Sequence, residues 1–179
     1  MASARPISSF ARDYVSYYEL THRPDELIAA LREHFPEEPV FPLYHMMKGD
    51  LAAARRQMEE RAANSGGRPD DLDMSYLLAL EGDKKGSEEL LARVIRETAI
   101  SPRATFYHHF TYDIACIYAI NGNGPEAMKW LRTTADTGFR SHTLFARDPF
   151  LDKIRGLPQF GQFMSETAVE HEKLRTEFY

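Results

Sequence analysis

The chain has 179 residues, of which 43% are hydrophobic and 27% charged, as is usual for a single folded globular domain. Its net charge of −5 argues against nucleic-acid binding, because such proteins usually concentrate basic residues on one face. The single cysteine, Cys116, excludes an intrachain disulfide and a multi-cysteine zinc site, and fits a reducing, cytoplasmic compartment. No signal peptide is recognisable, and no apolar run approaches the roughly 20 residues that span a bilayer, so we expect no membrane association.

The first 65 residues predict two helix pairs, over residues 8–35 and 39–65. In the first pair, an aromatic face running from Phe10 to Tyr18 is followed by a break, and Pro24 then suits the first turn of the second helix. In the second pair, a short helix from about Pro42 to Lys48 leads through a Gly49-Asp50 turn into the strong helix former LAAARRQMEERAA. Both pairs have helix–turn–helix organisation.

Two further pairs are predicted over residues 70–99 and 102–138. They follow Asn64–Asp71, the most loop-like stretch, which is too short for an interdomain linker. Gly82 and Gly122 provide the two turns, and Ser101 with Pro102 provides a helix start. No strand pattern competes with these helices, so the sequence predicts an all-α fold in one domain, residues 1–179.

Residues 142–179 predict a C-terminal cap. Asp148 is an N-cap followed by Pro149, which together open a short helix that turns three apolar residues inward, namely Phe150, Leu151 and Ile154. Pro158 begins the last helix, in which Phe160, Phe163 and Met164 can cover the preceding hairpin. The polar ending VEHEKLRTEFY suits the end of a helical solenoid.

Alignment on the turn glycines makes the repetition explicit. Gly49 and Gly82 are 33 residues apart, and Gly82 and Gly122 are 40 apart. Five positions after each glycine stands a small residue: Ala54, Ser87 and Ala127. Nine positions after each glycine stands a large apolar residue: Met58, Leu91 and Leu131. A small residue lets two helices approach, and a large one fills the groove between hairpins.

Periods near 34 residues with this pattern resemble tetratricopeptide repeats. The third unit matches best, through Ile114, Ala115 and Tyr118 in its first helix, whereas Pro42 and His45 depart from the pattern in the first unit. The stretch from Tyr112 onward is similar to the C-terminal repeat and cap of many bacterial tetratricopeptide proteins, which often end multidomain signalling proteins. The resemblance implies an α-solenoid of about four helix-turn-helix units with a C-terminal capping helix. It also implies a role in protein–protein interaction.

No residue pattern predicts catalysis, a metal site or a cofactor. His108 and His109 are adjacent, so they do not form the i, i+4 pair of a metal-binding helix. Cys116 lies mid-helix between Ala115 and Ile117, which favours a packed residue over a nucleophile. A helical enzyme remains an alternative only if groups such as His108, Asp113 and Glu126 share one cleft.

The partner is expected on the concave face formed by the first helix of each pair. On the alignment this face comprises Leu43, Met46, Leu72, Tyr76, His109, Tyr112 and Cys116. It is apolar and aromatic and lacks the Lys, Arg and Asn with which some tetratricopeptide modules grip a C-terminal carboxylate. It could accept a peptide or amphipathic helix, or be filled by the chain's own N-terminal helix.

The leading hypothesis is a non-enzymatic module that binds a protein or peptide. The alternative is homo-oligomerisation, as a homodimer, or a spacer role in a larger signalling protein.

Overall fold

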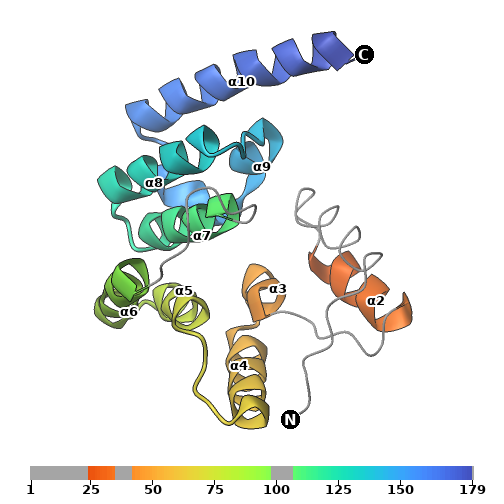
Figure 1. Ribbon diagram of the computed structural model, residues 1–179, viewed down its shortest axis with the longest axis vertical. Coiled ribbons are helices and arrows are strands. Elements are labelled where there is room, and N and C mark those ends of the chain that lie inside the picture. The colour runs from red at the N-terminus through yellow and green to blue at the C-terminus, as the bar shows by residue number, and fades with distance from the viewer. Residues whose placement is uncertain (1–23, 35–41, 98–106, 179) are drawn as a thin grey trace. The chain divides into compact units, whose positions relative to one another are not determined.

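The computed structural model, drawn in Figure 1, describes residues 24–34, 42–97 and 107–178, and every element in these ranges is a helix. The chain divides into two compact units, Met1–Arg68 and Pro69–Tyr179. The boundary falls inside Asn64–Asp71, the stretch that the sequence predicts to be a loop within one domain. None of the described helices is both long and apolar enough to cross a membrane.

The N-terminal unit contains α2 (Pro24–His34), α3 (Pro42–Met47) and α4 (Leu51–Ser65). Pro24 begins α2 as predicted, since a proline in the first turn forfeits no intrahelical hydrogen bond. The side chain of Asp50 caps α4 by accepting a hydrogen bond from the backbone of Ala53 at 3.0 Å. Gly66 ends α4 in the left-handed conformation, with φ of 69°.

The C-terminal unit begins with two helical hairpins. The first joins α5 (Asp71–Glu81) to α6 (Lys84–Glu97), and the second joins α7 (Tyr107–Ile120) to α8 (Gly124–Asp136). The predicted turn glycines, Gly82 and Gly122, both have positive φ, at 89° and 73°. Within this unit the two helices of each hairpin form the most extensive contacts.

The small residues of the glycine alignment are buried as predicted. Ala54, Ser87 and Ala127 are all 0% exposed, and the large apolar residues Met58, Leu91 and Leu131 are at most 3% exposed. A buried small side chain allows the partner helix to approach closely, so the spacing correctly identified the contact face of each second helix.

Buried polar side chains also join the helices of the C-terminal unit. Asn121, in the turn that follows α7, donates a hydrogen bond to the hydroxyl of Ser87 on α6 at 2.9 Å, and the Ser75 hydroxyl of α5 donates to the Ser87 carbonyl. Thr134 of α8 donates to Thr111 of α7 at 2.9 Å. These bonds satisfy polar groups that would be costly to bury alone.

Three helical elements complete this unit: α9 (His142–Arg147), the 3₁₀ helix η1 (Pro149–Ile154) and α10 (Pro158–Phe178). The predicted cap at Asp148, the inward apolar residues of η1 and the start of α10 at Pro158 are confirmed. The sequence had not separated α9 as a helix. In the structure η1 packs against α7, and α10 packs against α9 and α8.

Some predicted features lie outside the described residues. These are the aromatic helix proposed between residues 8 and 23, and the helix start at Ser101 and Pro102.

Candidate functional site

Five of the predicted binding residues belong to the C-terminal unit, where they lie on α5 and α7. We call this surface the α5–α7 face and define it by Leu72, Tyr76, His109, Tyr112 and Cys116. Tyr76 is 4% exposed and Cys116 0% exposed, while Leu72 and Tyr112 are half-buried and His109 is exposed. Of these five side chains, His109 is therefore the most open to solvent.

Residues 142–154, which we call the α9–η1 segment, cover the part of the α5–α7 face that contains Tyr76, Tyr112 and Cys116. The Tyr112 hydroxyl donates a hydrogen bond to Asp148 Oδ2 at 2.5 Å. The rings of Phe150 and Tyr76 form an edge-on contact with their centroids 5.1 Å apart. The ring centroids of Phe145 and Tyr112 are 5.7 Å apart. A groove was expected here, and the chain's own segment fills the part that contains Tyr76 and Tyr112.

Asp148 is the central residue of this contact and is 3% exposed. Its Oδ1 accepts a hydrogen bond from the Phe150 backbone at 2.8 Å, which caps η1, and its Oδ2 accepts from Tyr112. Arg155 donates to the backbone carbonyls of Asp148 and Phe145, at 2.7 and 3.1 Å. Because each carboxylate oxygen accepts a hydrogen bond, the free-energy cost of burying this charged side chain is reduced.

The thiol and the two tyrosine hydroxyls around Asp148 have raised pKa values. Burial raises the pKa of the Cys116 thiol well above its ordinary value, and the Asp148 carboxylate, whose Oδ2 lies 4.0 Å from Sγ, adds to this shift. Burial also raises the pKa values of Tyr76 and Tyr112, with Cys116 and Asp148 contributing next. Because a thiol reacts as its thiolate, Cys116 is suited to packing rather than to nucleophilic chemistry.

The open end of the α5–α7 face carries an aromatic stack. The His108 ring lies parallel to Phe139, with centroids 5.3 Å apart and 9° between the planes, and His109 lies 5.7 Å from Phe139. The pKa of His109 is lowered, first by burial and then by the neighbouring His108. This edge therefore presents stacked aromatic rings to solvent, and the lowered pKa of His109 favours the neutral form of its ring.

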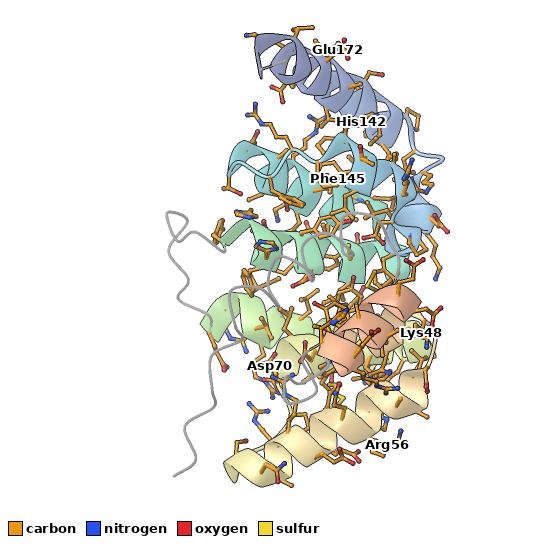
Figure 2. The ribbon with its side chains drawn as sticks, turned by 90° about the vertical axis from the view of Figure 1, so that its right-hand side faces the viewer. Lys48, Arg56, Asp70, His142, Phe145 and Glu172 are labelled. Carbon is orange, nitrogen blue, oxygen red and sulfur yellow. The ribbon has the colours of Figure 1, made fainter. Side chains whose placement is uncertain are left out.

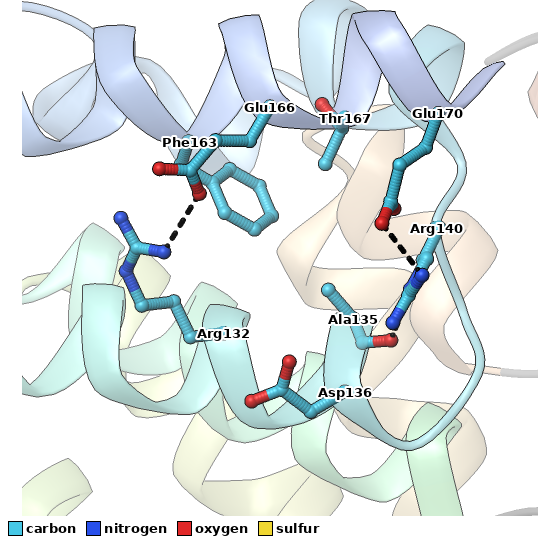
Figure 3. Close-up of a pocket in the computed structure, with 8 residues that line it drawn as sticks. All are labelled: Arg132, Ala135, Asp136, Arg140, Phe163, Glu166, Thr167 and Glu170. Atoms are coloured by element: carbon cyan, nitrogen blue, oxygen red, sulfur yellow. Dashed lines mark hydrogen bonds and ion pairs between the residues drawn. The ribbon is translucent and has the colours of Figure 1, made fainter. Parts of the chain in front are cut away.

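A shallow cleft of about 90 Å³ separates α8 from α10 (Figure 3). Arg132 pairs with Glu166 at 2.9 Å on one side, and Arg140 pairs with Glu170 at 2.7 Å on the other. Asp136, from the last turn of α8, also lines the cleft. The cleft is mostly charged, and its two arginines are already engaged by the capping helix.

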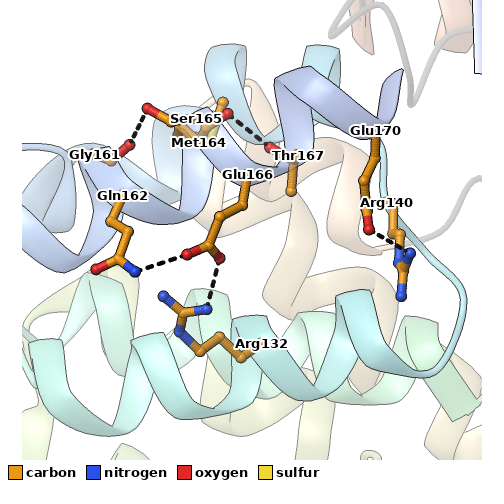
Figure 4. A network of polar contacts seen from close by, with 9 residues as sticks. All are labelled: Arg132, Arg140, Gly161, Gln162, Met164, Ser165, Glu166, Thr167 and Glu170. Carbon is orange, nitrogen blue, oxygen red and sulfur yellow. Dashed lines mark hydrogen bonds and ion pairs between the residues drawn. The ribbon is translucent and has the colours of Figure 1, made fainter. Parts of the chain in front are cut away.

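Further polar contacts extend along α10, as Figure 4 shows. Gln162 donates to the second oxygen of Glu166 at 2.8 Å, and the pKa of Glu166 is lowered by its hydrogen bonds to Arg132 and Gln162. Figure 2 labels His142 of α9 close to α10. Its Nδ1 lies 3.1 Å from the Thr167 hydroxyl of α10. These contacts hold the cap in place and leave little of the cleft for a ligand.

The two remaining predicted residues, Leu43 and Met46, lie on α3 in the N-terminal unit. Leu43 is half-buried and Met46 is 2% exposed, so Met46 belongs to the core of that unit. Burial lowers the pKa of the neighbouring His45 below its ordinary value.

Two of the three residues named for a helical enzyme contact other groups. His108 stacks on Phe139, and Glu126 pairs with Lys129 at 2.9 Å. Within the described ranges, no three His, Cys, Asp or Glu side chains come together in a way that could hold a metal ion.

Sequence reasoning identified Asp148 as a helix cap but missed its hydrogen bond to Tyr112. The available signal was its position among apolar residues, between Phe145 and Phe150, because a capping carboxylate in such a run tends to be buried with its helix end. Comparison of the sequence with protein-family models gave no match, and comparisons with curated proteins and with solved structures gave no significant match.

Proposed function

We propose that this chain is a non-enzymatic, cytoplasmic interaction module, built of tetratricopeptide-type helix pairs, that binds a peptide or helix of a partner protein on the α5–α7 face. One observation carries the proposal. This face already holds a short segment of the chain through contacts specific to individual side chains, namely the Tyr112–Asp148 hydrogen bond and the Tyr76–Phe150 ring contact.

Such contacts are the ones that peptide-binding grooves use. Aromatic side chains give large contact areas at little entropic cost, and one hydrogen bond to a charged group fixes the register. The exposed His109 and the half-buried Phe139 extend the same face to solvent, where a partner could begin to bind.

The proposal can be tested with a photo-reactive benzophenone amino acid at position 109 of the full-length chain. Irradiation in an extract of the source organism should give a discrete cross-linked product. The same group at position 165 is the matched control, because Ser165 is exposed on α10, which contributes no residue to this face.

A product specific to position 109 supports the module. Equal products from both positions, or none from position 109 in a correctly folded protein, would contradict binding at this face.

Self-association is the second candidate function, and the exposure of Val169 favours it. Among the side chains of α10 that the structure describes, it is the large hydrophobic one left exposed, and contact with a second copy would remove it from water. In purified protein, a cross-linked dimer formed from position 169 would support this candidate, and a strict monomer at high concentration would count against it.

A further inference from the structure

The α9–η1 segment acts as a ligand built into the α5–α7 face, and its contacts define what that face recognises. Phe145 contacts Tyr112 at a centroid distance of 5.7 Å, and Asp148, three residues later, accepts the Tyr112 hydroxyl. The recognised pattern is therefore an aromatic residue followed three positions later by aspartate. In this segment it is written Phe145-Ala-Arg-Asp148.

The same four residues occur once more in the sequence, as Phe10-Ala-Arg-Asp13. The aromatic residue and the aspartate have identical spacing in both places. In each place an aromatic residue also follows closely, Tyr14 after Asp13 and Phe150 after Asp148. The N-terminal sequence thus repeats the two groups that Tyr112 contacts in the α9–η1 segment, and it carries an aromatic ring one position earlier than Phe150, which contacts Tyr76.

We propose that the α5–α7 face of one chain binds the Phe10–Tyr14 sequence of a second copy. This sequence competes with the α9–η1 segment of the chain that carries the face. The inference rests on the proposed function and names its partner. Because the α9–η1 segment is covalently attached, it competes at a high effective concentration, of the order of millimolar for short connections. The segment therefore holds the face closed, and self-association increases when it is loosened.

The first test measures binding of a fluorescein-labelled peptide of residues 8–18 to the full-length chain by anisotropy. A chain carrying Asp148→Asn and Phe150→Leu keeps a capping side chain and an apolar residue, but loses the carboxylate and the ring. We expect this loosened chain to bind the peptide about tenfold more tightly than the unaltered chain, because the internal competitor is weakened.

Two controls define the contacts. A peptide with Phe10→Ala and Asp13→Ala should bind the loosened chain about tenfold less tightly, and adding Tyr112→Phe to that chain should weaken binding of the intact peptide similarly. A folded, loosened chain that binds neither peptide, or binds both equally, would overturn the inference.

A second measurement uses the unaltered chain and does not depend on the loosened one folding. The labelled peptide of residues 8–18 should bind the unaltered chain, and the peptide with Phe10→Ala and Asp13→Ala should bind it about tenfold less tightly. Equal binding of the two peptides to the unaltered chain would overturn the inference.

Light scattering then tests whether the second copy is the partner. The loosened chain should form dimers as concentration rises, and Phe10→Ala with Asp13→Ala should abolish them. A loosened chain that stays monomeric would overturn self-association. If benzophenone at position 109 still captured a different protein, only this inference would fall and the proposed function would stand.

Discussion

The Tyr112 hydroxyl donates a hydrogen bond of 2.5 Å to Asp148 Oδ2, joining residues 36 positions apart in the sequence. This bond ties α7 to the capping residue of η1. Together with Arg155, whose guanidinium donates to the Asp148 carbonyl, it holds the α9–η1 segment on the α5–α7 face.

Replacing Tyr112 with phenylalanine tests this bond directly. Tyr112→Phe keeps the ring and removes only the hydroxyl, so buried Asp148 Oδ2 loses its nearest donor and keeps the weaker Cys116 thiol at 4.0 Å. We expect the free energy of unfolding, measured in urea, to fall by about 1–3 kcal/mol. Tyr107→Phe is the matched control and should change it by less than about 0.5 kcal/mol. A loss no larger than the control's would show that the bond is not maintained in solution.

The stability of the protein should fall at alkaline pH. The pKa values of Cys116, Tyr76 and Tyr112 are raised in the folded state above ordinary values of 9.0 for cysteine and 10.0 for tyrosine. The unfolded chain therefore loses these protons first. Stability is fully present below pH 9.0 and declines as pH rises, by up to about 1.4 kcal/mol per pH unit for each group.

The contribution of Cys116 can be isolated with Cys116→Ala. Urea unfolding between pH 8 and pH 11 should give a shallower decline for this variant, because one group with a raised pKa has been removed. Parallel curves for the two proteins would mean that the thiol ionises equally readily in the folded and unfolded states.

Ala127 should not tolerate a larger side chain. It is 0% exposed between the helices of the second hairpin, so Ala127→Leu must push the helices apart, at a cost of about 1–3 kcal/mol through overpacking. Ala92→Leu adds the same atoms at an exposed position of α6 and serves as the control. Thermal unfolding compares the two, and equal midpoints would place residue 127 outside the contact in solution.

The Ser87 hydroxyl should contribute to joining α6 and α7. Ser87→Ala leaves the Asn121 amide without the acceptor that lies 2.9 Å away, and we expect a loss of about 1–3 kcal/mol in urea unfolding. Ser165→Ala, at an exposed position of α10, should change stability by less than about 0.5 kcal/mol. A variant at position 87 as stable as this control would imply that water replaces the lost acceptor.

Much of the local structure was predictable because its causes lie within a few residues. Asp148 with Pro149 marks the start of η1, Pro158 marks the start of α10, and Gly82 and Gly122 mark tight turns. The small residues at Ala54, Ser87 and Ala127 also identified buried helix contacts correctly. Capping, proline geometry and helical periodicity are local properties, so the sequence alone determined most of the described helices and their inward faces, α9 excepted.

Only the tertiary structure decided what covers those faces. Helical spacing placed Tyr76, Tyr112 and Cys116 on one surface, but it could not tell whether a partner or the chain itself fills it. That depends on contacts between residues distant in sequence, such as the one between Tyr112 and Asp148, which no local pattern encodes. The buried aspartate and the protonated Cys116 beside it follow from this long-range packing, because burial and hydrogen-bond partners set the state of an ionisable group.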